Sequence, residues 1–123
     1  MSVFARIAAV FTGRKKQSQE DRAAAEKAVG QLCTAFAPLV QKADSLRKKY
    51  PDIVHRIKRN SDRIKGIRPD ISIQAGKIEQ TIAQKITCVS SSCDAVLSGG
   101  DAQVLAVQLD ELEQLLKQRQ AIR

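Results

Sequence analysis

The chain has 123 residues, of which 43% are hydrophobic and 3% aromatic, and it carries a formal net charge of +8. A chain of that length is expected to form one domain with one hydrophobic core. Because aromatic residues are scarce, Leu, Ile, Val and Ala must fill this core, as they do in helical bundles. Its three cysteines form no CxxC pair and no apolar run approaches the roughly 18 residues of a membrane span, which excludes a disulfide-stapled secreted domain and a transmembrane protein and indicates a cytoplasmic one.

The first predicted element is a short amphipathic helix over residues 3–12, ended by Gly13 and followed at once by three cations. The candidate membrane-contact residues are Phe4, Ile7, Phe11, Arg14, Lys15 and Lys16. Three interpretations stay open: an anchor on an anionic membrane surface, an organellar presequence, or a first helix folded onto the bundle. We treat residues 1–16 as a separate basic segment and residues 17–123 as the helical domain.

The opening residues, Met1 to Ile7, resemble the N-terminal membrane helix of phage-shock-type coiled-coil proteins. This resemblance covers under a tenth of the chain. The remainder is shorter and more interrupted than the long helical hairpin of that family, so the chain is not assigned to it.

A long helix is predicted from residue 18 to residue 49, with Ser18 as its N-cap. Its apolar residues recur at alternating steps of four and three, the spacing of a helix that packs on other helices. These residues are Ala25, Val29, Leu32, Phe36, Leu39, Ala43, Leu46 and Tyr50. Because the spacing keeps its phase across Pro38, we predict one kinked helix rather than two.

A short basic helix is predicted from residue 53 to residue 65, with Asp52 as its N-cap after a stop at Pro51. The surrounding segment, residues 42–68, holds ten Lys and Arg against three Asp, whereas residues 69–123 have a net charge of −2. The candidate anion-binding or phosphate-binding residues are Arg47, Lys48, Lys49, Arg56, Arg59 and Arg63. Such a field attracts a polyanion, either nucleic acid or the acidic headgroups of a bilayer.

The next predicted helix runs from residue 71 to residue 97, restarted by Asp70. Its apolar stripe contains one shift in spacing between Ile82 and Ile86. The stripe consists of Ile71, Ala75, Ile78, Ile82, Ile86, Val89, Cys93 and Val96. A glycine turn after Ser98 makes the following helix its antiparallel neighbour.

The last predicted helix, residues 101–121, has two apolar lines instead of one. Four leucines form the first line, and Val104, Val107, Leu115 and Ile122 form the second. Since one antiparallel neighbour cannot cover both, this helix is either buried in the middle of the bundle or carries a partner-binding face. The candidate partner-binding residues are Val104, Leu115 and Ile122.

The sequence shows no combination of residues typical of catalysis or of cofactor or metal binding. His55 lacks an oriented nucleophile beside it, Cys88 and Cys93 project to different sides of one helix, and the acidic cluster at Asp110, Glu111 and Glu113 has no phosphate-binding loop. We therefore predict a protein that is not an enzyme and needs neither a cofactor nor a metal.

The predicted fold is all-α, an antiparallel bundle of three long helices with the short basic helix and the N-terminal amphipathic helix added. The predicted function is that of a helical adaptor or structural protein that acts through protein contacts, with its cationic side toward an anionic membrane surface. The alternative is a nucleic-acid-binding protein that uses the basic segment 47–68, and self-association is left open.

Overall fold

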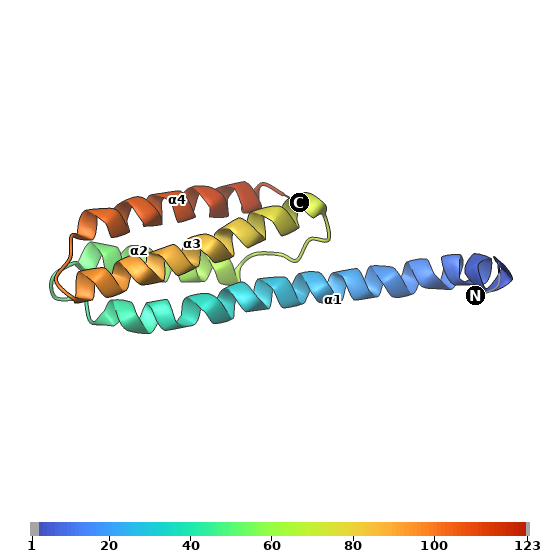
Figure 1. Cartoon of the computed structure of the whole chain (residues 1–123), viewed down its shortest axis with the longest axis horizontal. Coiled ribbons are helices and arrows are strands. Elements are labelled where there is room, and N and C mark those ends of the chain that lie inside the picture. Colours follow the sequence, from blue (N-terminus) through green and yellow to red (C-terminus); the bar gives the residue numbers. More distant parts are fainter. Residues whose placement is uncertain (1–2, 123) are drawn as a thin grey trace.

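The computed structural model describes the backbone of residues 3–122 and the side chains of residues 20–122. Within these residues every regular element is a helix, which confirms an all-α fold: α1 is Val3–Asp44, α2 is Pro51–Lys65, α3 is Ile73–Leu97 and α4 is Ala102–Gln120. Successive helices run in opposite directions (Figure 1). Helix α1 contacts α2 and α3, and α4 also contacts α2 and α3, so the pairs α1/α4 and α2/α3 lie on the diagonals.

Helix α1 differs from the predicted element at both ends. It is continuous from Val3, so no break occurs at Gly13 or Ser18, where we expected a stop and a new start. A single glycine lowers helix stability by only about 1 kcal/mol and does not by itself end a helix. The predicted membrane-contact side chains, from Phe4 to Lys16, lie outside the described side chains.

The end of α1 comes five residues before the predicted residue 49. After Asp44 the backbone tightens, because the N–H groups of Ser45 and Leu46 donate to carbonyls three residues earlier, at 3.2 and 2.8 Å. Helix α2 then begins with Pro51, whose missing N–H is harmless in a first turn. Asp52 therefore lies inside the first turn and is not the N-cap we predicted.

The predicted apolar line is buried from Ala25 to Leu46, whereas its last member, Tyr50, is half-buried. Each buried residue of this line has a buried α3 counterpart numbered 50 higher, from Ala25 with Ala75 to Leu46, just after the end of α1, with Val96. This constant difference fits two parallel helices in register. It also agrees with Lys42, which contacts Ser90 and Asp94, each at 2.9 Å.

Helices α3 and α4 pair in the antiparallel sense, so buried partners have numbers that add to 198, as in Val89 with Leu109. Four buried α2 residues, Ile53, Ile57, Asn60 and Ile64, have numbers 52 below buried residues of α4, as in Ile57 with Leu109. Each of the four central layers of the core thus takes one residue from each helix, and the next layer takes Ile67 of the following connection in place of an α2 residue. One such layer contains Leu39, Ile57, Val89 and Leu109, which are at most 1% exposed.

Two positions in these layers hold charged residues, which the apolar pattern did not predict. Glu79 is 6% exposed and Arg119 is 1% exposed, and they form an ion pair of 2.8 Å. Because Glu79 rather than Ile78 occupies the core position of α3, its buried residues keep steps of four and three throughout. The predicted shift in spacing between Ile82 and Ile86 was therefore wrong.

The start of α3 also differs from the prediction. Ile71 precedes the helix and is 60% exposed, so it does not belong to the buried stripe. The N-cap is Ser72, whose Oγ accepts from the N–H of Ala75 at 3.1 Å, instead of Asp70. Asp70 accepts from the N–H of Ser72 at 2.8 Å and so shapes the turn before the helix.

The connection between α2 and α3, residues 66–72, joins helices on a diagonal and therefore crosses the end of the bundle. Ile67 in this connection is 6% exposed and continues the core position of α2. Arg119 Nη2 donates to the carbonyl oxygen of Arg68 at 2.6 Å, and this hydrogen bond holds the connection against α4. At the opposite end, Gly99 takes a φ of 99° in the tight turn before α4.

Candidate functional site

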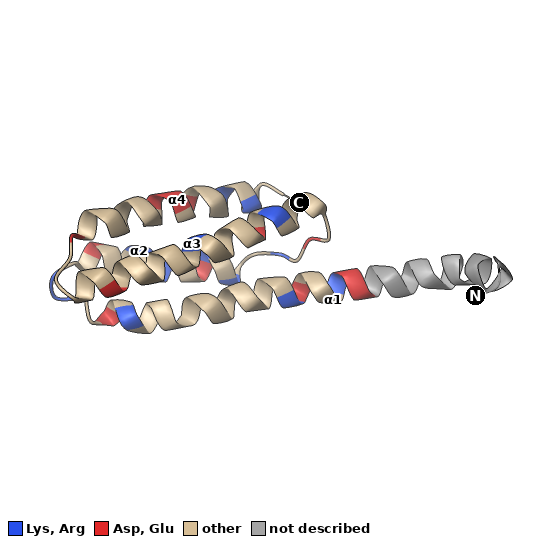
Figure 2. Ribbon diagram, in the orientation of Figure 1, with Lys and Arg blue, Asp and Glu red and all other residues tan. Residues whose placement is uncertain are grey.

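The predicted basic residues lie on α2 and on the turn that precedes it, which is blue in Figure 2. Arg47, Lys48 and Lys49 are exposed on this turn. On α2, Arg59 is exposed and Arg63 is half-buried. The segment therefore remains a cationic surface, but its members do not all face solvent.

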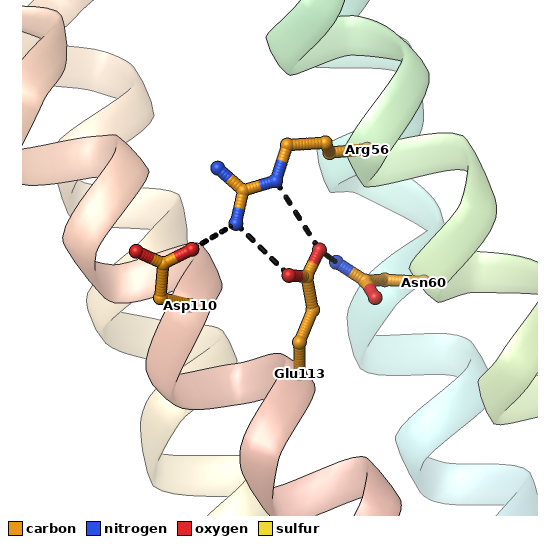
Figure 3. A network of polar contacts seen from close by, with 4 residues as sticks. All are labelled: Arg56, Asn60, Asp110 and Glu113. Carbon is orange, nitrogen blue, oxygen red and sulfur yellow. Dashed lines mark hydrogen bonds and ion pairs between the residues drawn. The ribbon is translucent and has the colours of Figure 1, made fainter.

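Arg56 lies at the boundary between α2 and α4, where acidic residues of α4 surround it (Figure 3). Its Nη2 donates to Asp110 Oδ1 at 2.5 Å and to Glu113 Oε1 at 2.9 Å, while its Nε donates to Glu113 Oε2 at 3.3 Å. Asn60 Nδ2 adds a hydrogen bond of 3.2 Å to Glu113 Oε2. We call Arg56, Asn60, Asp110 and Glu113 the α2–α4 network.

The network changes the acidity of its members. Burial alone raises the pKa of Glu113, but the hydrogen bonds and positive charge of Arg56, with help from Asn60 and the charge of Arg63, leave that pKa lowered overall. The same hydrogen bonds, which Arg56 donates to Glu113, raise the pKa of Arg56. Arg56 forms ion pairs with two carboxylates of α4 and so links α2 to α4. Because its charge is already neutralised there, it is poorly placed to bind an external anion.

Other cations of the segment differ in their partners. Arg47 pairs with Asp44 at 2.8 Å, and Lys58 lies 3.7 Å from the same carboxylate, both as exposed pairs of small energetic weight. On the turn before α2 and on α2 itself, five cations take part in no ion pair among the described residues: Lys48, Lys49, Arg59, Arg63 and Lys65. We call these five residues the cationic face; Arg68, which also has no ion pair among the described residues, lies beyond α2 in the connection to α3.

Ion pairs between the two hairpins follow one rule in the described part of the chain. The cation comes from the α1–α2 hairpin and the carboxylate from the α3–α4 hairpin, as in Lys42 with Asp94 and Arg56 with Glu113. Lys85 with Glu111 and Arg119 with Glu79 are pairs inside the second hairpin. The acidic groups of α3 and α4 are thus largely engaged within the fold, and the surplus of positive charge remains on the first hairpin.

Sequence reasoning missed the role of the acidic cluster on α4. In the sequence, Asp110, Glu111 and Glu113 form an acidic cluster without a phosphate-binding loop, and that pattern assigned them no role. In the structure each side of α4 meets a different neighbour, so Asp110 and Glu113 bind Arg56 of α2 while Glu111 binds Lys85 of α3. The spacing of the three carboxylates could have indicated these contacts. A helix that packs against two neighbours can present polar residues to each of them from different sides.

The candidate partner-binding residues, on α4 and just after it, differ in exposure. Val104 is 54% exposed, whereas Leu115 packs partly against the core and Ile122 is half-buried near the chain end. Val107 is 47% exposed, so α4 is not buried in the middle of the bundle, as one interpretation required. The exposed apolar part of α4 is the pair Val104 and Val107.

A cleft of about 520 Å³ lies beneath the crossing connection at the end of the bundle. It is lined by Gly66, Ile67, Arg68, Pro69, Asp70, Arg119, Gln120 and Ile122. The buried guanidinium at this cleft already binds Glu79 and a backbone carbonyl, so it has little charge to offer a ligand.

His55 is exposed on α2. Over residues 20–122 no group of three or more His, Cys, Asp or Glu is placed to hold a metal ion. Nor, in the described part of the chain, is any helix both long and apolar enough to cross a membrane.

Comparison of the chain with models of protein families, with curated proteins and with solved structures found no match. The cationic face and the residues around it are therefore the features that bear on function.

Proposed function

We propose that the protein is a non-enzymatic helical adaptor that binds an anionic membrane surface through its first hairpin and contacts proteins through its second. The observation that carries this proposal is the cationic face, five Lys and Arg side chains without an ion pair among the described residues. A polybasic surface gains about 1 kcal/mol per Lys or Arg from anionic lipids. In this proposal the protein is cytoplasmic and peripheral to a membrane.

A second attachment comes from the sequence of residues 3–16, which carries apolar residues and four cations without any acidic residue. This segment opens the same helix, α1, that leads into the cationic face. Stable peripheral binding generally needs two such signals, because one amphipathic segment or one basic patch alone holds only weakly. Both signals lie on the α1–α2 hairpin.

Nucleic acid is the alternative ligand for the cationic face, and exposed lysines such as Lys48 and Lys49 support it. One observation favours the membrane. Tyr50 is the one aromatic residue in the basic segment, and it packs against the core instead of offering a surface for stacking bases. Arg56, one of the candidate anion-binding residues, is occupied by carboxylates and favours neither ligand.

The second hairpin supports the protein-binding half of the proposal. Val104 and Val107 are exposed one turn apart on α4. A partner helix that covers them would bury apolar side chains that water now contacts. Leu115 and Ile122 would lie toward the rim of such a contact, since both are already partly covered.

Cosedimentation with liposomes tests the membrane half. Full-length protein is expected to bind vesicles rich in phosphatidylserine and to remain in solution with phosphatidylcholine alone. Lys48→Ala/Lys49→Ala should weaken binding about thirtyfold, from the loss of about 2 kcal/mol. The matched control is Lys77→Ala/Lys117→Ala, which removes the same charge from exposed positions of the second hairpin and should bind almost as the parent does.

The same variants separate the two ligands. Phe4→Ser/Phe11→Ser should weaken liposome binding and leave retention of DNA or RNA unchanged. If nucleic acid is the ligand, Lys48→Ala/Lys49→Ala weakens its binding and flattens the salt dependence, while the phenylalanine variant has no effect. Absence of binding to both ligands at physiological salt would refute the cationic face as a binding surface.

A further inference from the structure

Two large apolar side chains are exposed at the start of α3. Ile71 is 60% exposed and Ile73 is 79% exposed. All other isoleucines among the described side chains are buried or half-buried. The two exposed ones flank the N-cap Ser72, at the end of the bundle where α1 continues past the other helices (Figure 1).

Charged residues of both signs surround these isoleucines. Because α1 and α3 are in register with a difference of 50, Ile73 lies level with Ala23 of α1 and Ile71 lies level with Asp21. The carboxylates near this level are Glu20, Asp21, Glu26 and the half-buried Asp70, and the exposed cations near it are Arg22, Lys27, Arg68 and Lys77. Among the described residues none of these eight forms an ion pair. An exposed apolar spot among carboxylates that have no ion pair can receive an amphipathic helix whose cations meet those carboxylates.

The chain itself contains such a helix sequence in residues 3–16. The apolar set is Val3, Phe4, Ile7, Val10 and Phe11, and the cations are Arg6, Arg14, Lys15 and Lys16. Since α1 is one helix from Val3 to Asp44, this segment continues along the axis of α1 and does not turn back onto Ile73 of its own chain. A second copy can supply it.

We propose that the protein forms an antiparallel dimer in which residues 3–16 of each copy pack on Ile71 and Ile73 of the other. The continuation of the core spacing of α1 upstream of Ala25 supports this arrangement. At steps of three and four it passes through Arg22, Ser18 and Lys15, which are polar, and then through Phe11, Ala8 and Phe4, which are apolar again. The polar stretch matches the place where the bundle ends, and the apolar stretch beyond it needs a different cover.

Charge complementarity sets the register of the dimer. If the two α1 helices run antiparallel with facing residues whose numbers add to 34, Phe11 lies level with Ala23 and therefore with Ile73 of the other copy. In the same register Arg14 faces Glu20. The two-fold axis passes near Gln17, so each contact is made twice, as in an isologous interface.

The dimer and the membrane-bound state use the same apolar residues of 3–16, so they exclude one another. The dimer does not depend on the proposed function, because its second surface, Ile71 and Ile73, is not part of the cationic face. Ile71→Ser/Ile73→Ser should therefore abolish dimerisation and leave liposome binding intact. Lys48→Ala/Lys49→Ala should weaken liposome binding and leave dimerisation intact. Failure of one proposal is thus distinguishable from failure of the other.

Sedimentation velocity of the full chain over a concentration series tests the dimer. We expect a dimer that dissociates on dilution and at high salt, and monomers at all concentrations for Ile71→Ser/Ile73→Ser. Far-UV circular dichroism with thermal melting should show that this variant stays folded, since both side chains are exposed. The matched control is Val104→Ser/Val107→Ser, which removes two exposed apolar residues from α4 and should still dimerise.

A mixing experiment identifies the two surfaces as partners. Phe4→Ser/Phe11→Ser and Ile71→Ser/Ile73→Ser should each be monomeric alone. Mixed together they should form a weaker heterodimer, because the intact segment 3–16 of one variant meets the intact isoleucines of the other. A parent chain that stays monomeric up to about 100 µM would overturn the proposal. Undiminished dimerisation of the isoleucine variant would also overturn it.

Discussion

Polar side chains occupy single positions of the core. Glu79 of α3 is 6% exposed and Arg119 of α4 is 1% exposed, and the two form an ion pair. Asn60 of α2 is fully buried; its Nδ2 donates to Glu113, and its Oδ1 lacks a hydrogen-bond partner within the described part of the fold. Because a buried polar group is costly without a partner, these positions depend on side chains from other helices.

Arg119 provides the first prediction. Arg119→Met should lower the free energy of unfolding by about 3–5 kcal/mol, because it leaves the Glu79 carboxylate buried without its cation. The double variant Glu79→Leu/Arg119→Met should recover most of that loss, since a layer of apolar residues needs no charge pairing. Urea denaturation of both variants measures this. A double variant as unstable as the single one would show that the pair does more than neutralise its own charges.

At the scale of the element, α1 continues through Pro38 at the expense of a hydrogen bond. Pro38 has no N–H to donate to the carbonyl of Thr34, yet the residues around it, Phe36 and Leu39, are each 1% exposed. Burial of this face outweighs the local penalty, which is why the unbroken apolar spacing predicted helix continuity where the proline alone predicted a break.

Replacement of this proline should therefore stabilise the protein. Pro38→Ala restores one N–H donor to an exposed helical position and should raise the free energy of unfolding by about 1–3 kcal/mol. Thermal melting followed by circular dichroism measures the change. The control Ala37→Gly, at the adjacent exposed position, should destabilise by about 1 kcal/mol. A Pro38→Ala variant that melts lower than the parent would mean that the proline shapes α1 in a way the core requires.

Pairing of α2 with α4 depends on Glu113 being ionised. Its pKa in the folded chain is below the ordinary value of 4.5, so its contribution to stability is present above about pH 4.5 and is lost as the pH falls through the lowered folded value. Glu113→Gln should cost about 1–2 kcal/mol at neutral pH and should show a smaller further loss in acid than the parent. Melting temperatures between about pH 7 and pH 3 test this. Glu26→Gln, which alters an exposed carboxylate outside the α2–α4 network, should follow the parent.

For the molecule as a whole, the sequence predicted the helical class and the buried line of α1, but not the placement of the charges. The pattern of steps in α1 survives from Ala25 to Leu46 because a line of apolar residues has a single physical solution, burial against other helices. The basic residues of α2 are not constrained in this way, because a charged side chain can lie either in solvent or in an ion pair. Which of these residues meets α4 depends on the packing of helices far apart in sequence, so Arg56 could not be separated from Arg59 beforehand.

A molecule with one cationic hairpin should bind a surface in one orientation, and the native cysteines give a probe for it. Cys88 is exposed on α3, while burial of Cys93 raises the pKa of its thiol and lowers its reactivity. In a Cys33→Ala background, a fluorophore on Cys88 should remain open to the neutral quencher acrylamide when the protein is on anionic liposomes. In a second variant with Cys88→Ala, a fluorophore on Lys48→Cys should become shielded on the same liposomes. Equal shielding at both positions would contradict an oriented complex.

The layered core also defines how this rod of helices tolerates changes in length. All four helices advance through the core by alternating steps of three and four, so the pattern returns to its starting side after every seven residues. Insertion of seven residues into each helix at one level would add two layers and about 10 Å of length, with both turns and the crossing connection left as they are. Insertion of a single residue rotates everything beyond it by about 100° and turns buried side chains toward water. Insertions in all four helices should therefore preserve the core only in multiples of seven residues.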